Sequence, residues 1–141
     1  MRRYSLTLDL KNDPELISQY EGLHKKVWPE IISSIKNAGI ENMQIYRYGT
    51  RLFMIMEVND DFSFEKKKQA DTNNAKVQEW EELMWKYQQP LPGSAPGEKW
   101  IVMDKIFELA QFIGSNAGIY QALHKPLPPL VKRILKYLKL N

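Results

Sequence analysis

Tyr20 and His24 are the residues of this sequence whose types and spacing could support proton transfer. They stand four positions apart in the stretch YEGLHKKVWPE, so on a helix both side chains would lie on one face and could touch one substrate. Histidine takes and gives protons near neutral pH because its ordinary pKa is about 6.5, and tyrosine adds a hydroxyl group that can donate, accept or orient. The spacing alone favours a simpler interpretation, a surface histidine beside a half-buried tyrosine.

Tryptophan side chains are the next candidates, because their flat apolar faces pack against the C–H faces of sugars as readily as against core residues. The sequence has four of them, Trp28, Trp80, Trp85 and Trp100. Burial in the core is the simpler interpretation for each. Trp80 and Trp85 are five positions apart and do not share a helix face well, so we expect only one of these two to face a pocket.

Several other kinds of site are missing from the sequence. It has no cysteine, no glycine-rich phosphate loop, no HExxH pattern and no set of His, Asp or Glu residues at metal-ligand spacing. A catalytic serine would need His24 or His124 as its base, and the sequence has no nucleophile elbow. We therefore expect no metal ion, no nucleotide and no other cofactor.

The net charge of +3 is distributed unevenly along the 141 residues. The last acidic residue is Glu108; the segment after it carries a charge of +5, and the rest of the chain carries −2. Basic character is therefore confined to the tail, and nucleic acid is not an expected partner. The N-terminus lacks the apolar region of a signal peptide and no apolar run is long enough to span a bilayer, so we expect a cytoplasmic protein.

The segment around Tyr20 and His24 must be positioned by a strand and an interrupted helix. Residues 2–10 alternate apolar and polar side chains, which predicts a half-buried strand. Asp13 as N-cap and Pro14 at the first helical position predict the start of a helix. Pro29 should kink or restart that helix, and Gly39 should end it.

Two strands, two helices and a returning strand are predicted for the rest of the domain. Residues 43–48 and 52–58 are strands joined by a tight turn, and the second is central because it is apolar on both faces. The remaining elements, in chain order, are a short charged helix over 60–70, a helix over 75–87 capped by Asn73 or Asn74, a Pro- and Gly-rich loop over 88–98 and a strand over 100–109.

This order of elements, β-α-β-β-α-β, predicts an α+β domain with the ferredoxin-like arrangement. Its single sheet would carry both helical segments on one face and leave the other face uncovered. A sheet face rich in Tyr, Met and Ile needs a partner. The economical partner is a second copy of the chain, so we expect a homodimer packed sheet against sheet.

The segment over 110–141 has a different character from the domain over 1–109. Apolar and basic residues alternate with helical spacing after the Pro-rich stretch 126–129, which predicts a hinged, amphipathic, basic helix. We favour packing of this helix on its own domain or on the dimer partner over contact with a membrane surface.

The motif H-K-K-V-W-P-E, with a tyrosine four residues before the histidine, resembles the L-rhamnose/L-fucose mutarotase family. Three further stretches support the resemblance: ENMQIYRY after AGI, VQEW near Trp80, and PGEKWIVMDKIFEL. The resemblance covers residues 1–109. It implies a ferredoxin-like domain that forms a dimeric α/β barrel and interconverts the α and β anomers of 6-deoxy-L-sugars without metal or cofactor.

The resemblance also implies roles for individual residues. His24 matches the family's catalytic acid/base, and Tyr20 matches a neighbouring tyrosine that contacts the substrate. Trp80 matches the first of two tryptophans that border the sugar. Glu81 stands where the second is usual, and Met43 stands where the rhamnose enzymes have a tyrosine; both positions would line the pocket.

The identity of the sugar and the path of the protons are further expectations. The loop before Trp100 looks more like the L-fucose branch, so L-fucose is favoured over L-rhamnose. His24 would transfer a proton at the ring oxygen or at the anomeric hydroxyl, and Tyr20 would orient the sugar or relay the second proton. Trp80 would stack on the sugar, and Pro29 would set the aim of Trp28 beside the substrate.

Two other function classes stay open on the sequence. Small monooxygenases and haem-degrading proteins use the same dimeric architecture, although fold similarity does not carry function. A non-catalytic sugar-binding protein is the second alternative. Oxygen uptake and anomer exchange, measured on the same sample, would separate the three classes.

Overall fold

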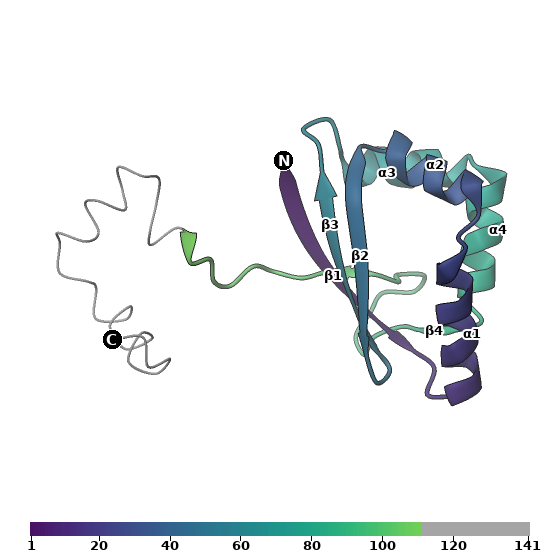
Figure 1. The fold of residues 1–141 in the computed structure, drawn as a ribbon. Helices are drawn as coiled ribbons and strands as arrows, with labels where there is room; N and C mark the ends of the chain where they lie inside the picture. Colours follow the sequence, from purple (N-terminus) through teal and green to yellow (C-terminus); the bar gives the residue numbers. More distant parts are fainter. Residues whose placement is uncertain (111–141) are drawn as a thin grey trace, which may run out of the picture. The chain divides into compact units, whose positions relative to one another are not determined.

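The computed structural model describes residues 1–110, and within them the chain forms one sheet with helices packed on it (Figure 1). Residues Met1–Asp104 make one compact unit, and a second unit begins at Lys105. The elements in chain order are β1 (Arg2–Leu10), α1 (Pro14–Lys25), α2 (Pro29–Asn37), β2 (Ile40–Tyr48), β3 (Arg51–Val58), α3 (Phe64–Thr72), α4 (Ala75–Met84), β4 (Gln88–Gln89) and β5 (Ile101–Val102).

The sheet has the strand order β2-β3-β1-β4, and β5 also pairs with β1. Every pairing is antiparallel. The β3 strand lies between β1 and β2, which confirms that residues 52–58 form a central strand. The order and the pairing confirm the predicted α+β, ferredoxin-like fold, with each helical segment divided in two.

The first helical segment is divided where the proline predicts it. The Asp13 carboxylate accepts hydrogen bonds from the backbone N–H groups of Glu15 and Leu16, which caps α1. The first helix ends at Lys25, and α2 begins at Pro29, whose ring cannot occupy a helix interior without losing a backbone hydrogen bond. Gly39 follows α2 with φ of 93°, a conformation that favours glycine.

The core lies between the sheet and the helices. The alternation predicted for residues 2–10 is confirmed, because Leu6, Leu8 and Leu10 are buried on the helix side of β1. Two clusters of buried side chains fill this layer. The first gathers around Tyr20 and Trp80, and the second consists of Leu6, Ile40, Met54, Met56, Val58 and Phe62.

The last strand of the fold differs from its prediction. The loop over 88–98 contains a short strand, because Gln89 and Gln88 pair with Asp9 and Leu10 of β1. The strand over 100–109 is limited to β5, which pairs with Leu6 and Thr7. The edge of β1 therefore pairs with two short strands, β4 and β5, and the Pro- and Gly-rich stretch lies between them in the sequence.

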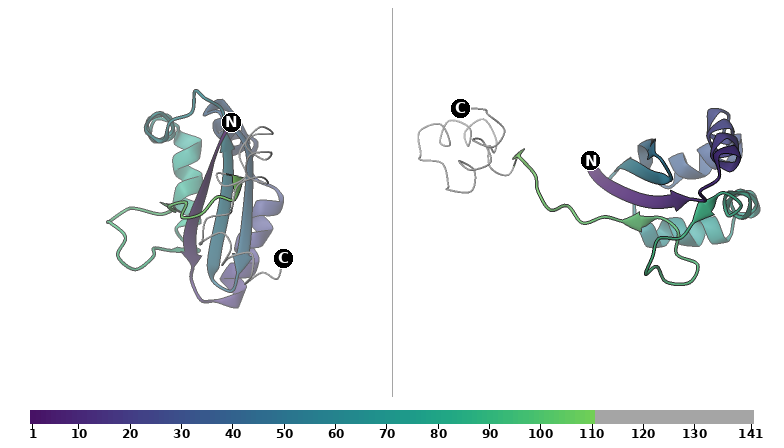
Figure 2. Two further views of the ribbon diagram at one scale, coloured as in Figure 1. Left: turned by 90° about the vertical axis from the view of Figure 1, so that its left-hand side faces the viewer. Right: turned by 90° about the horizontal axis from the view of Figure 1, so that it is seen from below.

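The helices of the described part lie on one side of the sheet, as the views from the side and from below show (Figure 2). The opposite face presents Phe53 and Ile55, which are half-buried, and Tyr46, which is 54% exposed. Methionine is less prominent on this face than predicted, since Met54 and Met56 point into the core. The single chain forms an open sheet, so the barrel made by two copies stays a prediction.

The predicted hinge at 126–129 and the amphipathic basic helix lie outside the described residues. The boundary at residue 109 and the role of the tail therefore stay predictions. Within residues 1–110, no helix is both long enough and apolar enough to cross a membrane.

Candidate active site

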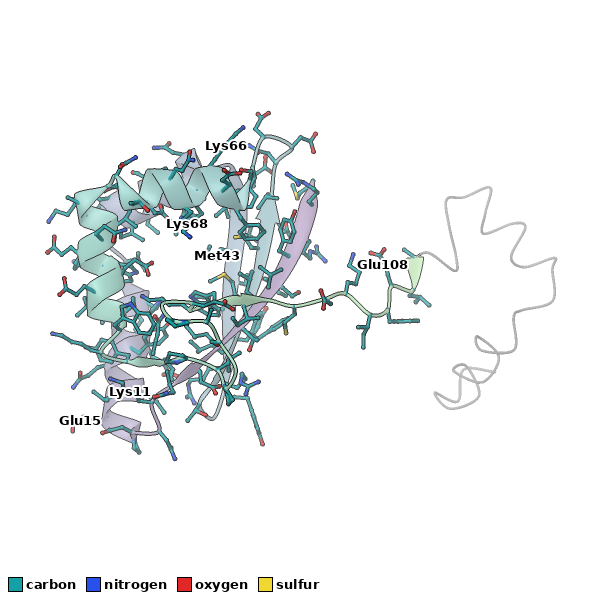
Figure 3. All side chains as sticks on the ribbon, turned by 180° about the vertical axis from the view of Figure 1, so that it is seen from behind. Lys11, Glu15, Met43, Lys66, Lys68 and Glu108 are labelled. Carbon is teal, nitrogen blue, oxygen red and sulfur yellow. The ribbon has the colours of Figure 1, made fainter. Side chains whose placement is uncertain are left out.

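A cavity of about 740 Å³ opens between the helices and the sheet. Five of the six predicted site residues line it: Tyr20, His24, Met43, Trp80 and Glu81. Figure 3 shows Met43 reaching from β2 toward the space between sheet and helices. A second, smaller cavity of about 410 Å³ shares Tyr20 and His24 with the first, so these two side chains stand at the junction of both.

His24 occupies the last turn of α1, and its Nδ1 lies 2.8 Å from the backbone carbonyl oxygen of Tyr20. A carbonyl oxygen can only accept, so in the neutral ring Nδ1 carries the proton and Nε2 carries a free lone pair. Burial lowers the pKa of His24 below its usual value of 6.5, and the hydrogen bond to the carbonyl opposes this in part. The side chain is therefore neutral near pH 7, with a basic nitrogen available.

Tyr20 is almost completely buried, with 3% of its surface exposed, and its ring centre lies 4.3 Å from that of His24. The Nε2 of Gln88 donates a hydrogen bond to the Tyr20 hydroxyl oxygen at 3.4 Å. Burial raises the pKa of Tyr20 to about 12; the Gln88 hydrogen bond opposes the rise and the charge of Glu81 adds to it. Tyr20 therefore keeps its proton at physiological pH and can act as a donor.

Trp80 forms an aromatic wall of the cavity from the middle of α4. Its ring meets the His24 ring edge-on at 5.8 Å, and the Trp28 ring packs against it at 5.0 Å in a T-shaped arrangement. Trp28 is not among the side chains that line either cavity. In the structure Trp28 contacts Trp80 and supports its ring. Its contact with the substrate stays a prediction.

Glu81 joins α4 to the loop that follows β4. Lys99 donates hydrogen bonds to the Glu81 carboxylate at 2.7 Å and to the Glu81 carbonyl oxygen at 2.9 Å. The same ammonium lies 4.5 Å from the ring centre of Trp85, and the Lys99 side chain is only 11% exposed. This cluster holds the end of the loop against the helix beside the cavity.

Sequence reasoning missed Gln88 and Lys99 and gave Trp100 no specific role. Gln88 and Trp100 line the cavity, and Gln88 is 4% exposed. Glutamine is usually exposed, and this one stands in a stretch with loop composition, so no local signal marks it. Only its pairing with β1 brings it to the site.

Within residues 1–110, no three His, Asp or Glu side chains gather in a way that could hold a metal ion. The site instead combines a neutral imidazole that accepts a proton, a phenol that donates one, and an aromatic wall. Such a set suits acid/base chemistry on a small ligand that carries both hydroxyl groups and an apolar face.

Comparison with known families matches residues 3–109 to the model of the L-rhamnose mutarotase family. The chain is 43% identical over 120 residues to the L-fucose mutarotase of Xanthomonas campestris pv. campestris, covering 84% of this chain and 96% of that protein. It is 28% identical over 80 residues to the L-rhamnose mutarotase of Oceanobacillus iheyensis, covering 55% of this chain and 69% of the relative.

Among solved structures, the fold is similar to that of the L-rhamnose mutarotase of Formosa agariphila. The TM-score is 0.58 at 22% sequence identity, with 77% of this chain and 99% of the other covered. At this identity the structural likeness shows the fold.

Proposed function

The chain belongs to the L-rhamnose mutarotase family, and from this premise we propose that it interconverts the α and β anomers of a 6-deoxy-L-sugar. L-Fucose is the favoured substrate over L-rhamnose. The 43% identity to an L-fucose mutarotase supports this preference. A cytoplasmic location, expected from the sequence, is part of the proposal.

The observation that carries the proposal is the placement of His24 beside Tyr20 at the cavity junction. His24 offers an unprotonated Nε2, and Tyr20 offers a hydroxyl that holds its proton. Mutarotation requires removal of a proton from the anomeric hydroxyl and delivery of one to the ring oxygen. One base and one acid, both facing one cavity, meet this requirement.

In the proposed mechanism, the Nε2 of His24 takes the proton of the anomeric hydroxyl while the bond between C1 and the ring oxygen breaks. Tyr20 gives its proton to the leaving ring oxygen, so an open-chain aldehyde forms without a covalent intermediate. Rotation about the C1–C2 bond exposes the other face of the carbonyl, and the reverse transfers close the ring. Assistance by each positioned group is typically worth about 10²–10⁴-fold in rate.

Trp80 would hold the sugar by its apolar C–H face, with Trp100 also facing the cavity. A flat aromatic surface binds either anomer, because the two differ only at C1. Met43 and Glu81 line the same cavity and are the positions that we propose to set the choice of sugar.

We also propose that the functional form is a homodimer joined through the open sheet face. Phe53, Ile55 and Tyr46 form an apolar strip on that face, which water would otherwise cover. An Ile55→Lys variant should sediment as a monomer at concentrations where the wild-type protein sediments as a dimer. A wild-type protein that sediments as a monomer at every concentration would overturn this part of the proposal.

Saturation-transfer NMR tests the function directly, because it reads the exchange between the two anomeric protons at equilibrium. We expect the protein to accelerate exchange of L-fucose more than that of L-rhamnose, and to leave D-glucose at its spontaneous rate. Lack of acceleration for both 6-deoxy-L-sugars would overturn the proposal. Oxygen uptake by the same sample, or sugar binding without exchange, would favour the oxygenase or the binding alternative.

A further inference from the structure

Resting on the proposed function, we propose that Gln88 is a substrate-binding residue of the same site. Its Oε1 accepts a hydrogen bond from a hydroxyl group of the sugar, and its Nε2 holds the Tyr20 hydroxyl so that the phenolic proton points at the substrate. Gln88 would thus both bind the sugar and orient the hydroxyl group of Tyr20.

The backbone around β4 explains how Gln88 reaches the cavity. Gln88 pairs with Leu10, so both side chains lie on the helix side of the sheet. The backbone N–H of Lys11 donates to the Tyr87 carbonyl oxygen at 2.8 Å, which fixes the backbone at the residue before Gln88. Gln88 therefore projects from a hydrogen-bonded strand into the cavity, and its aim does not depend on a free loop.

The side-chain amide of Gln88 is half satisfied. Its Nε2 donates to the Tyr20 hydroxyl oxygen, whereas its Oε1 is fully buried without a hydrogen-bond partner among the described residues. The cluster of buried side chains on this side of the sheet, which includes Leu10, Trp80 and Met84, is mainly apolar. Gln88 lines the cavity, a buried carbonyl oxygen needs a donor, and a sugar hydroxyl is a donor of the right kind.

The same contact constrains the Tyr20 hydroxyl. The oxygen accepts from the Gln88 amide, so the phenolic O–H must find its acceptor elsewhere. The side chain lines both cavities, which leaves a ligand oxygen as the available acceptor. Gln88 consequently contributes to catalysis by positioning the acid, in addition to its own contact with the sugar.

The test uses Gln88→Met, which keeps the length of the side chain and removes both polar atoms. Exchange rates are measured against concentration for L-fucose and for its 2-, 3- and 4-deoxy forms. We expect kcat/KM on L-fucose to fall about tenfold, the usual scale for one hydrogen bond, and the loss to shrink on the one deoxy sugar that lacks the bound hydroxyl. Gln89→Met, on the exposed neighbour in β4, is the matched control and should behave as wild type.

A second variant, Gln88→Glu, covers the case in which Gln88→Met does not fold. An ionised carboxylate only accepts, so it would attract the Tyr20 proton away from the sugar and lower kcat at pH 8 with a smaller change in KM. Wild-type kcat in Gln88→Glu, or an equal loss in Gln88→Met on all four sugars, would overturn this inference alone. No catalysis by the wild-type protein would overturn the proposed function and this inference with it.

Discussion

The Nδ1 of His24 lies 2.8 Å from the backbone carbonyl oxygen of Tyr20, one helical turn earlier in α1. Because that oxygen can only accept, the contact sets the tautomer of the neutral ring and leaves Nε2 as the basic nitrogen. The spacing of four residues thus does two things. It places the base beside the acid, and it uses the backbone of one residue to fix the proton of the other.

Tyr20→Phe removes the proposed acid and keeps the ring. We expect anomer exchange to slow by about 10²-fold or more, because the ring oxygen would lose its donor. The amide of Gln88 would lose its partner, and this should cost about 1–3 kcal/mol of unfolding free energy. NMR exchange rates and thermal unfolding measure the two effects.

Tyr87→Phe is the matched control, since Tyr87 is also buried and its ring lies 6.1 Å from that of Tyr20. We expect near-normal exchange for this variant. Equal slowing in both variants would show that the Tyr20 hydroxyl acts through packing and not as a donor.

The pH dependence of kcat/KM should reflect the two perturbed groups. Since burial lowers the pKa of His24 from 6.5, the fall in rate on the acid side, as His24 becomes protonated, should have its midpoint below pH 6.5. The pKa of Tyr20 is raised to about 12, so the acid should still hold its proton at pH 10. A plateau from neutral pH to pH 10 is expected in exchange assays. A midpoint at or above pH 6.5 on the acid side would contradict the assignment.

Much of the fold could be predicted from the sequence because its signals are local. Asp13, Pro14, Pro29 and Gly39 each act within one turn of chain, and each appears in the structure at the role predicted for it. The last strand could not be predicted in the same way. Its division into β4 and β5 depends on which part of the β1 edge each piece meets, and that information lies about 80 positions away for β4 and about 95 for β5.

For the site as well, local signals could be predicted from the sequence and long-range contacts could not. Tyr20 and His24 could be singled out because their spacing on a helix already implies a shared face. Gln88 and Lys99 could not, since their importance comes from burial and from partners on distant elements. Trp28 is the opposite case, because the sequence singled it out beside the motif. In the structure its ring packs against Trp80, which lines the cavity.

Met43→Tyr should move the preference toward L-rhamnose. Met43 lines the cavity from β2, and a tyrosine there would add a hydroxyl group that can bond a sugar oxygen. We expect the ratio of kcat/KM for L-rhamnose over L-fucose to rise about tenfold, the scale of one added contact in a pocket. Competition NMR on a mixture of both sugars measures this ratio.

The control for this variant is Gln44→Tyr, which adds the same side chain at the next position of β2. Gln44 is exposed and pairs with Ile55 on the open face of the sheet, away from the cavity. Its sugar preference should stay that of the wild type. An unchanged ratio in Met43→Tyr would remove position 43 from the residues that set specificity.

The central claim is that His24 moves a proton of the sugar, and saturation-transfer NMR on His24→Ala tests it most directly. Lys26→Ala, an exposed change two residues further along, serves as the control for folding and handling. We predict that His24→Ala stays folded, by thermal unfolding and sedimentation, while its catalysed anomer exchange falls by about 10²–10⁴-fold. Exchange at the wild-type rate in a folded His24→Ala protein would contradict the account.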